Sequence, residues 1–197
     1  MKKIIDYFKS IFKKKEYSIY FKTAYLLLGS LLFPTIVAST GLVLNISVNI
    51  FDYIIGIILL FGSYYYFFYD KNNKKDFFIP IIISIIIYLM CIAVTYVFYD
   101  NTQDGLSYHL PATLKLAEGW NPVYHHYDKG SIIGIWGEHY PKFIWINGAM
   151  LYQITKHVFS PTSFTFVIVF ASLFLYYDII YRITKKNLLS MISSLLI

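Results

Sequence analysis

Four long apolar runs constrain this chain more than any other feature of its sequence. They cover residues 23–46, 50–69, 77–99 and 162–181, and each has about the 20 residues that an α-helix needs to cross a bilayer. Lipid offers the backbone no hydrogen-bond partner, so a run at that depth has to be helical. With 57% hydrophobic and 14% charged residues, the sequence predicts an all-α integral membrane protein with four full transmembrane helices.

Basic residues mark three segments that alternate with these runs along the chain. They hold most of the 17 Lys and Arg residues, and the positive-inside rule predicts that all three are cytoplasmic. The segment 100–161 is then a large external loop. The membrane topology thus explains the positive net charge of the chain, and nucleic-acid binding is not expected. The residues concerned are Lys2, Lys3, Lys9, Lys13, Lys14, Lys15, Lys22, Lys71, Lys74, Lys75, Arg182, Lys185 and Lys186.

The two ends of the chain carry their own expectations. Residues 1–22 are expected to form a cytoplasmic basic segment. Within it, apolar side chains of residues 2–15 recur at helical spacing among lysines, which predicts an amphipathic helix on an anionic membrane surface; a disordered basic tail is the alternative. Residues 23–99 hold the first three spans. Residues 162–197 hold the fourth span, a cytoplasmic turn and the start of a fifth apolar run, which indicates an incomplete chain or a truncated gene product.

The predicted external loop contains two amphipathic segments with helical character. Residues 105–118 form the first, with Asp104 as a candidate N-cap and Gly119 after its end. Residues 141–157 form the second, which is expected to lie along the membrane surface or to dip into the bilayer. The stretch between them is rich in turn residues and is expected to be irregular. All five histidines of the chain lie in this loop.

The start of this loop resembles the GT-C superfamily of polytopic glycosyltransferases. Residues 104–111, Asp-Gly-Leu-Ser-Tyr-His-Leu-Pro, are similar to the acidic stretch that opens the first large external loop of bacterial members. The later His139-Tyr140-Pro141-Lys142 resembles the Tyr-Pro element of the family's second loop helix. The resemblance covers roughly residues 96–185. Many members have one span before the loop, whereas this chain has three, and the family's later spans have no counterpart here.

The resemblance implies an inverting enzyme of the mannosyltransferase and aminoarabinose-transferase kind. Such an enzyme moves a sugar from a polyprenyl phosphate to a glycan, lipid or protein on the outer face of the membrane. Frequent Lys, Ile, Asn and Tyr suggest a bacterial inner membrane. Two rivals are a polysaccharide or lipid transporter and a non-catalytic membrane assembly subunit. A transporter is disfavoured because the runs hold almost no polar residues at mid-membrane depth.

Asp104 is the candidate catalytic residue. Sugar transfer to a hydroxyl requires a carboxylate that takes the acceptor proton, and Asp104 matches the position of the family's proposed base. The alternative is that Asp104 only caps the loop helix. Asp100 and Asp104 could also share a divalent cation, Mg or Mn, since carboxylates suit both ions; for Asp100 the alternative is an interfacial charge.

Further loop residues are candidates for binding the substrate. His109 could contact a phosphate or a hydroxyl, or make a structural hydrogen bond. Glu138 and Lys142 could contact the sugar or phosphate, or form a solvated helix start. A zinc site of histidines is disfavoured because adjacent histidines rarely ligate one ion together. The three tryptophans could stack on a sugar or anchor at the interface. The substrate-binding candidates are Asp100, Tyr108, His109, Glu138, Tyr140 and Lys142.

Overall fold

The computed structural model describes residues 17–127, 130–137 and 139–196. Its four long helices are α2 (Ile19–Val43), α3 (Ile50–Phe68), α4 (Lys75–Thr95) and α7 (Ser163–Thr184). All four helices are long and apolar enough to cross a membrane, and no described residue lies in a strand. The predicted class, an all-α membrane protein with four spans, is confirmed. The predicted N-terminal amphipathic helix lies outside the described residues.

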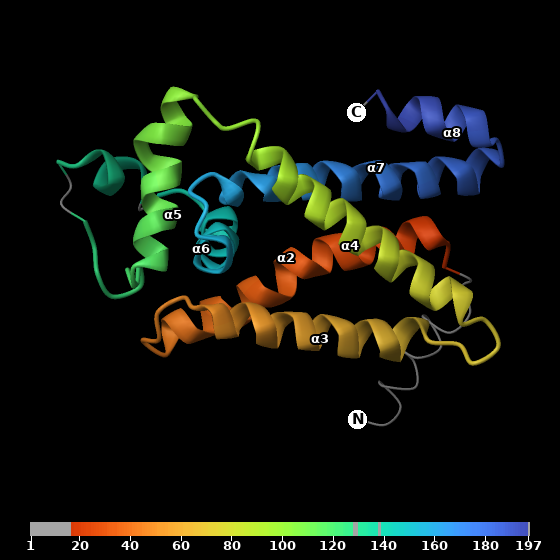
Figure 1. The fold of residues 1–197 in the computed structure, drawn as a ribbon, viewed down its shortest axis with the longest axis horizontal. Helices are drawn as coiled ribbons and strands as arrows, with labels where there is room; N and C mark the ends of the chain where they lie inside the picture. Colours follow the sequence, from red (N-terminus) through yellow and green to blue (C-terminus); the bar gives the residue numbers. More distant parts are fainter. Residues whose placement is uncertain (1–16, 128–129, 138, 197) are drawn as a thin grey trace.

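Helix α2 is the centre of the bundle and contacts α3, α4 and α7 (Figure 1). Glycines let α2 and α3 approach closely. A Cβ added to Gly56 would collide with the backbone of Pro34, and one added to Gly29 would collide with the side chain of Leu60. Small residues at a helix crossing give this kind of tight packing in membrane proteins. Pro34 therefore sits at the α2–α3 contact inside a continuous helix.

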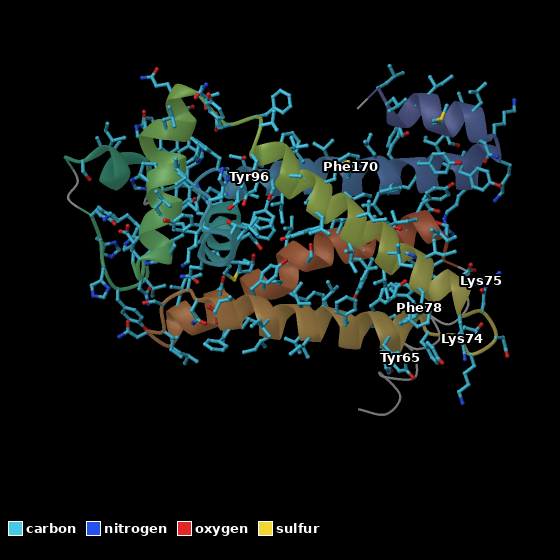
Figure 2. The ribbon with its side chains drawn as sticks, viewed as in Figure 1. Tyr65, Lys74, Lys75, Phe78, Tyr96 and Phe170 are labelled. Atoms are coloured by element: carbon cyan, nitrogen blue, oxygen red, sulfur yellow. The ribbon has the colours of Figure 1, made fainter. Side chains whose placement is uncertain are left out.

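One end of the bundle, here called the basic end, gathers the start of α2, the α3–α4 turn and the α7–α8 turn (Figure 1). Figure 2 shows Lys74 and Lys75 at this end and Tyr96 toward the other. Buried charges are paired here: Asp178 accepts from Ser18 Oγ and, at 2.6 Å, from Arg182 Nε.

Beyond the α7–α8 turn, the chain continues as a short helix. Helix α8 (Asn187–Ser194) contacts α7, and its Ser190 and Ser194 are buried.

At the opposite end, here called the loop end, a π-helical turn, η1 (Gly105–His109), continues into α5 (Leu110–Ala117). The helix predicted over residues 105–118 is present, and Gly119 follows it with a φ of +105°. The predicted N-cap is wrong. Asp104 already has a helical backbone and makes no capping hydrogen bond, while Thr102 Oγ1 accepts from the Gly105 N–H at 3.0 Å.

Helix α6 (Phe143–Thr155) packs inside the protein, and its predicted course along the membrane surface stays a prediction. Every residue from Trp145 to Leu151 is buried. Figure 1 shows α6 nearly end-on, so it runs across the direction of the four long helices, next to α5. Its turn to α7 contains a short 3₁₀ helix, η3 (Ser160–Thr162).

Two amide side chains fix α6 in this position. Asn147 Nδ2 donates to Thr35 Oγ1 of α2 at 2.6 Å. Gln153 Nε2 donates to the backbone oxygens of Val48, at 3.1 Å, and Ala117, at 3.0 Å. These residues made a membrane crossing unlikely from the sequence, and the hydrogen bonds show where their amide N–H groups donate inside the protein.

Candidate functional site

A pocket of about 400 Å³ lies at the loop end, here called the end pocket. Its wall comes from η1, α5, the start of α6, η3 and the start of α7, and most of it is apolar. The polar side chains that line it are Asp100, His109, Thr113, Thr162 and Thr165. A concave, mainly apolar site with a few polar groups is the usual form of a small-molecule pocket.

Asp100 is held at the pocket wall by the turn that precedes η1. Its Oδ1 accepts the Thr102 backbone N–H at 2.9 Å, and its carboxylate lies directly against the Cα of Gly105. The Thr102 side chain and backbone N–H, and to a smaller extent the charge of His109, lower the pKa of Asp100. Asp100 is therefore a fixed negative charge at neutral pH, and a weak proton acceptor.

His109 is oriented by a hydrogen bond from α6. The indole Nε1–H of Trp145 donates to His109 Nδ1 at 2.9 Å, and Trp145 itself is 2% exposed. An Nδ1 that accepts leaves the proton of a neutral imidazole on Nε2. His109 thus presents an N–H donor in a pocket that also contains a carboxylate. Both the phosphate-contact and the structural interpretations are compatible with this geometry.

Asp104 is exposed and is not among the residues that line the end pocket. It lies instead beside Tyr108, which is 5% exposed. The pKa of the Tyr108 phenol is raised to about 12, first by its hydrogen bond with Tyr140, then by burial and the Asp104 carboxylate. The structure brings Asp104, Tyr108 and Tyr140 together, and of the two acids only Asp100 lines the pocket.

Lys142 contacts both Tyr140 and Trp145. Its Nζ donates to the Tyr140 backbone oxygen at 2.9 Å and is 5.7 Å from the centroid of the Trp145 ring. Lys142 is therefore the cation that the structure brings next to Trp145 at the pocket wall. Glu138, the remaining substrate-binding candidate, lies outside the described residues.

The described part of the chain contains no group of three or more His, Cys, Asp or Glu side chains that could hold a metal ion. His125, His126 and His139 are exposed. Of the proposed Asp100–Asp104 pair, Asp100 lines the pocket and Asp104 does not.

The lining residues missed from the sequence include Thr113, Ile144, Phe159, Thr162 and Thr165. They come from three separate segments that only the fold brings together. One sequence signal was available. Gly148 lies in the middle of a predicted helix, and a Cβ there would collide with Pro161 and Thr113. A glycine at such a place indicates a close approach of other segments.

Comparisons with protein-family models, with curated proteins and with solved structures find no match to this chain. A functional proposal therefore rests on the site itself and on the residues that compose it.

Proposed function

We propose that this chain forms part of the active site of an integral membrane glycosyltransferase. The observation that carries the proposal is the end pocket, which combines a fixed carboxylate and an oriented imidazole with an apolar wall at the end of the membrane spans. A polyprenyl-phosphate-linked sugar has matching parts, an apolar chain and a polar head at membrane depth.

The proposed reaction is a single displacement with inversion. The acceptor hydroxyl attacks C1 of the donor sugar while the bond from C1 to the phosphate oxygen breaks. Asp104 takes the hydroxyl proton, and polyprenyl phosphate leaves with the bonding electron pair. Because Asp100 has a lowered pKa, Asp104 remains the better candidate for the base.

The leaving phosphate carries negative charge that has to be stabilised. The His109 Nε2–H and the Lys142 ammonium are the candidate donors to its oxygens. Asp100, which is anionic, is assigned a different task in this proposal: through Thr102 and Gly105 it fixes the conformation of the segment that leads into Asp104.

The orientation of the chain is part of the proposal, with the basic end cytoplasmic and the end pocket outside. The positive-inside rule supports it, because the start of α2, the α3–α4 turn and the α7–α8 turn, which all carry basic residues, share one end of the bundle (Figure 1). Cysteine labelling in intact cells tests it. After Cys91→Ala, which removes a buried thiol, a membrane-impermeant maleimide should label His125→Cys but not Lys71→Cys. The reverse pattern contradicts the orientation. Continuation of α8 into a fifth span also remains a proposal.

A shared Mg or Mn ion between Asp100 and Asp104 remains a prediction. No step above uses it, because the two carboxylates face different surroundings. Added chelator tests it directly. Unchanged transfer in the presence of excess EDTA excludes the shared ion, and loss that is restored by Mg or Mn supports it.

The two rivals make different demands on the structure. An assembly subunit would be favoured if Asp100 and Asp104 both pointed away from any cavity. Asp100 lines the pocket and Asp104 does not, so this condition is not met. A transporter requires polar groups along a path through the membrane. The buried Asp178 carboxylate does not supply one, because it lies at the basic end and pairs there with Arg182 and Ser18.

The experiment for the enzyme hypothesis uses the complete gene product reconstituted in lipid vesicles. Labelled sugar should pass from polyprenyl phosphate to an acceptor, with release of polyprenyl phosphate. His109→Gln and Lys142→Gln should each lower the rate without changing the fold. Absence of transfer with a panel of polyprenyl-phosphate hexoses, pentoses and aminopentoses contradicts the proposal.

A further inference from the structure

Two aromatic side chains beside the end pocket are exposed although their neighbours are buried. Trp136 is 48% exposed and Tyr140 is 37% exposed, whereas Tyr108 beneath them is 5% exposed. The Trp136 and Tyr108 rings are stacked at 6.2 Å with 28° between their planes. The Trp136 and Tyr140 rings are 6.3 Å apart and inclined by 62°. Trp136 and Tyr140 are called the aromatic platform below.

The position of the aromatic platform separates it from an ordinary membrane anchor. Trp136 belongs to the π-helical turn η2 (Ile133–Gly137). In Figure 1 this turn lies at the far end of the molecule from the α3–α4 turn, with α5 between it and the long helices. Interfacial tryptophans lie at the level of the lipid headgroups, next to the ends of the spans. The turn η2 instead lies farther from the basic end than the long helices do (Figure 1).

The other two tryptophans have structural tasks in the fold. Trp145 is buried and donates to His109. The Trp120 indole N–H donates to the His125 backbone oxygen at 2.7 Å, and its ring packs edge-on against Tyr127. Of the three tryptophans that could stack on a sugar, Trp136 is therefore the one with an exposed face near the proposed site.

Hydrogen-bonding groups border the aromatic platform. The Asp104 carboxylate and the Tyr140 side chain both act on the Tyr108 phenol, and the Tyr108 and Tyr140 rings each lie next to the Trp136 ring. A sugar ring has an apolar C–H face that packs on an aromatic ring, and an edge of hydroxyls that needs acceptors. The exposed Trp136 indole offers the aromatic face, and the neighbouring Tyr140 phenol offers a hydrogen-bonding group.

We infer that the aromatic platform binds a carbohydrate acceptor, with one sugar ring on Trp136 and its hydroxyls directed to Asp104 and Tyr140. Its role as an acceptor site rests on the proposed glycosyltransferase function, but carbohydrate binding itself does not. The inference selects a glycan from the three acceptor classes of glycan, lipid and protein. It also gives Asp104 a substrate hydroxyl within reach.

Binding is tested with the complete protein in lipid nanodiscs and three trisaccharides, namely chitotriose, mannotriose and maltotriose. Saturation-transfer NMR reports binding without any need for transfer. We expect at least one trisaccharide to bind saturably, with the signal strongest for the ring protons of one sugar. Trp136→Ala should weaken this binding about tenfold or more, and Trp136→Phe should retain most of it because it keeps an aromatic face.

Ile135→Ala is the matched control. Ile135 is 46% exposed in the same turn, so its removal takes away apolar surface without an aromatic face, and binding should stay unchanged. The inference is overturned if none of the trisaccharides binds, if Trp136→Ala binds as the wild type does, or if Ile135→Ala and Trp136→Ala weaken binding equally. The last result would indicate a general apolar contact surface.

Binding and transfer fail independently. Trisaccharide binding that depends on Trp136, in a protein that transfers no sugar, keeps the carbohydrate site and refutes the enzyme. Transfer that is unaffected by Trp136→Ala keeps the enzyme and refutes the platform as its acceptor site.

Discussion

Replacement of Gly105 by alanine tests the geometry of the end pocket, because Gly105 lies directly against Asp100. A Cβ added there would come closer to the Asp100 carboxylate and to Thr102 Oγ1 than real Cβ atoms do. The carboxylate therefore has to move and give up its 2.9 Å hydrogen bond with the Thr102 N–H. The Gly105 backbone has no positive φ, so alanine is accepted by the backbone itself and the effect reports on the contacts with the Asp100 and Thr102 side chains.

The expected cost follows from two opposing terms. Alanine in place of a helical glycine gains about 0.5–1 kcal/mol, while loss of a hydrogen bond to a charged group costs about 1.5–3 kcal/mol. Asp100 is only half-buried, so the lower part of that range applies and the net loss is about 1 kcal/mol. For a chain of this size this corresponds to a melting temperature lower by roughly 2–4 °C.

Gly62→Ala is the matched control, because no atom lies within 4 Å of a Cβ added at Gly62. Melting of both variants is followed by intrinsic fluorescence in the same detergent. Gly62→Ala should melt at or slightly above the wild-type temperature, and Gly105→Ala below it with impaired sugar transfer. If Gly105→Ala melts together with Gly62→Ala and transfers normally, the proposed contact between Gly105 and Asp100 is wrong.

Three further results are expected. Gly56→Ala collides with the backbone of Pro34, which cannot rotate away, so it should destabilise the α2–α3 pair by about 1–3 kcal/mol in thermal unfolding. Hydrogen bonds to the Asp100 carboxylate lower its pKa. The ionised carboxylate therefore stabilises the fold above about pH 4, and this contribution is lost as the pH falls through the lowered pKa. In thermal unfolding below about pH 4, the wild type should lose stability more steeply than Asp100→Asn. Trp145→Phe keeps most of the ring but removes the donor to His109, so it should slow transfer about tenfold while unfolding changes by less than about 1.5 kcal/mol; an unchanged rate would show that the hydrogen bond is only structural.

The four spans were predictable because lipid leaves the backbone no alternative. Any run of about 20 apolar residues has to become a helix that satisfies its own hydrogen bonds, and all four observed helices coincide with predicted runs to within a few residues. The end of α5 was predictable for a similar local reason, since Gly119 adopts the positive φ that terminates a helix.

The surroundings of α6 were not predictable in this way. Asn147 and Gln153 look like solvent-facing residues in the sequence, and their partners, Thr35, Val48 and Ala117, belong to other helices and turns. A polar side chain in a buried helix is distinguishable from an exposed one only when its partners are known. The burial of α6 was not predictable from its own sequence for this reason.

The candidate site was predicted in part. The acidic segment and His109 come from one short stretch of chain, so the sequence alone could identify Asp100 and His109, which share the pocket wall. Local sequence favoured Asp104 as the N-cap, but the side chain that accepts the Gly105 N–H is that of Thr102, two residues earlier. The separation of Asp104 from the pocket depends on which face of η1 it occupies, and the π-helical geometry of that turn has no signal in the sequence.

The most direct test of the central claim compares Asp104→Asn with Glu118→Gln in the complete, reconstituted protein. Glu118 is an exposed carboxylate in the same loop, paired with Lys115 at 3.0 Å, and such a surface pair contributes at most about 1 kcal/mol. The account predicts that Asp104→Asn lowers the rate of sugar transfer about 100-fold or more, with an unchanged melting temperature, while Glu118→Gln transfers at the wild-type rate. Equal rates for Asp104→Asn and the wild type would contradict it.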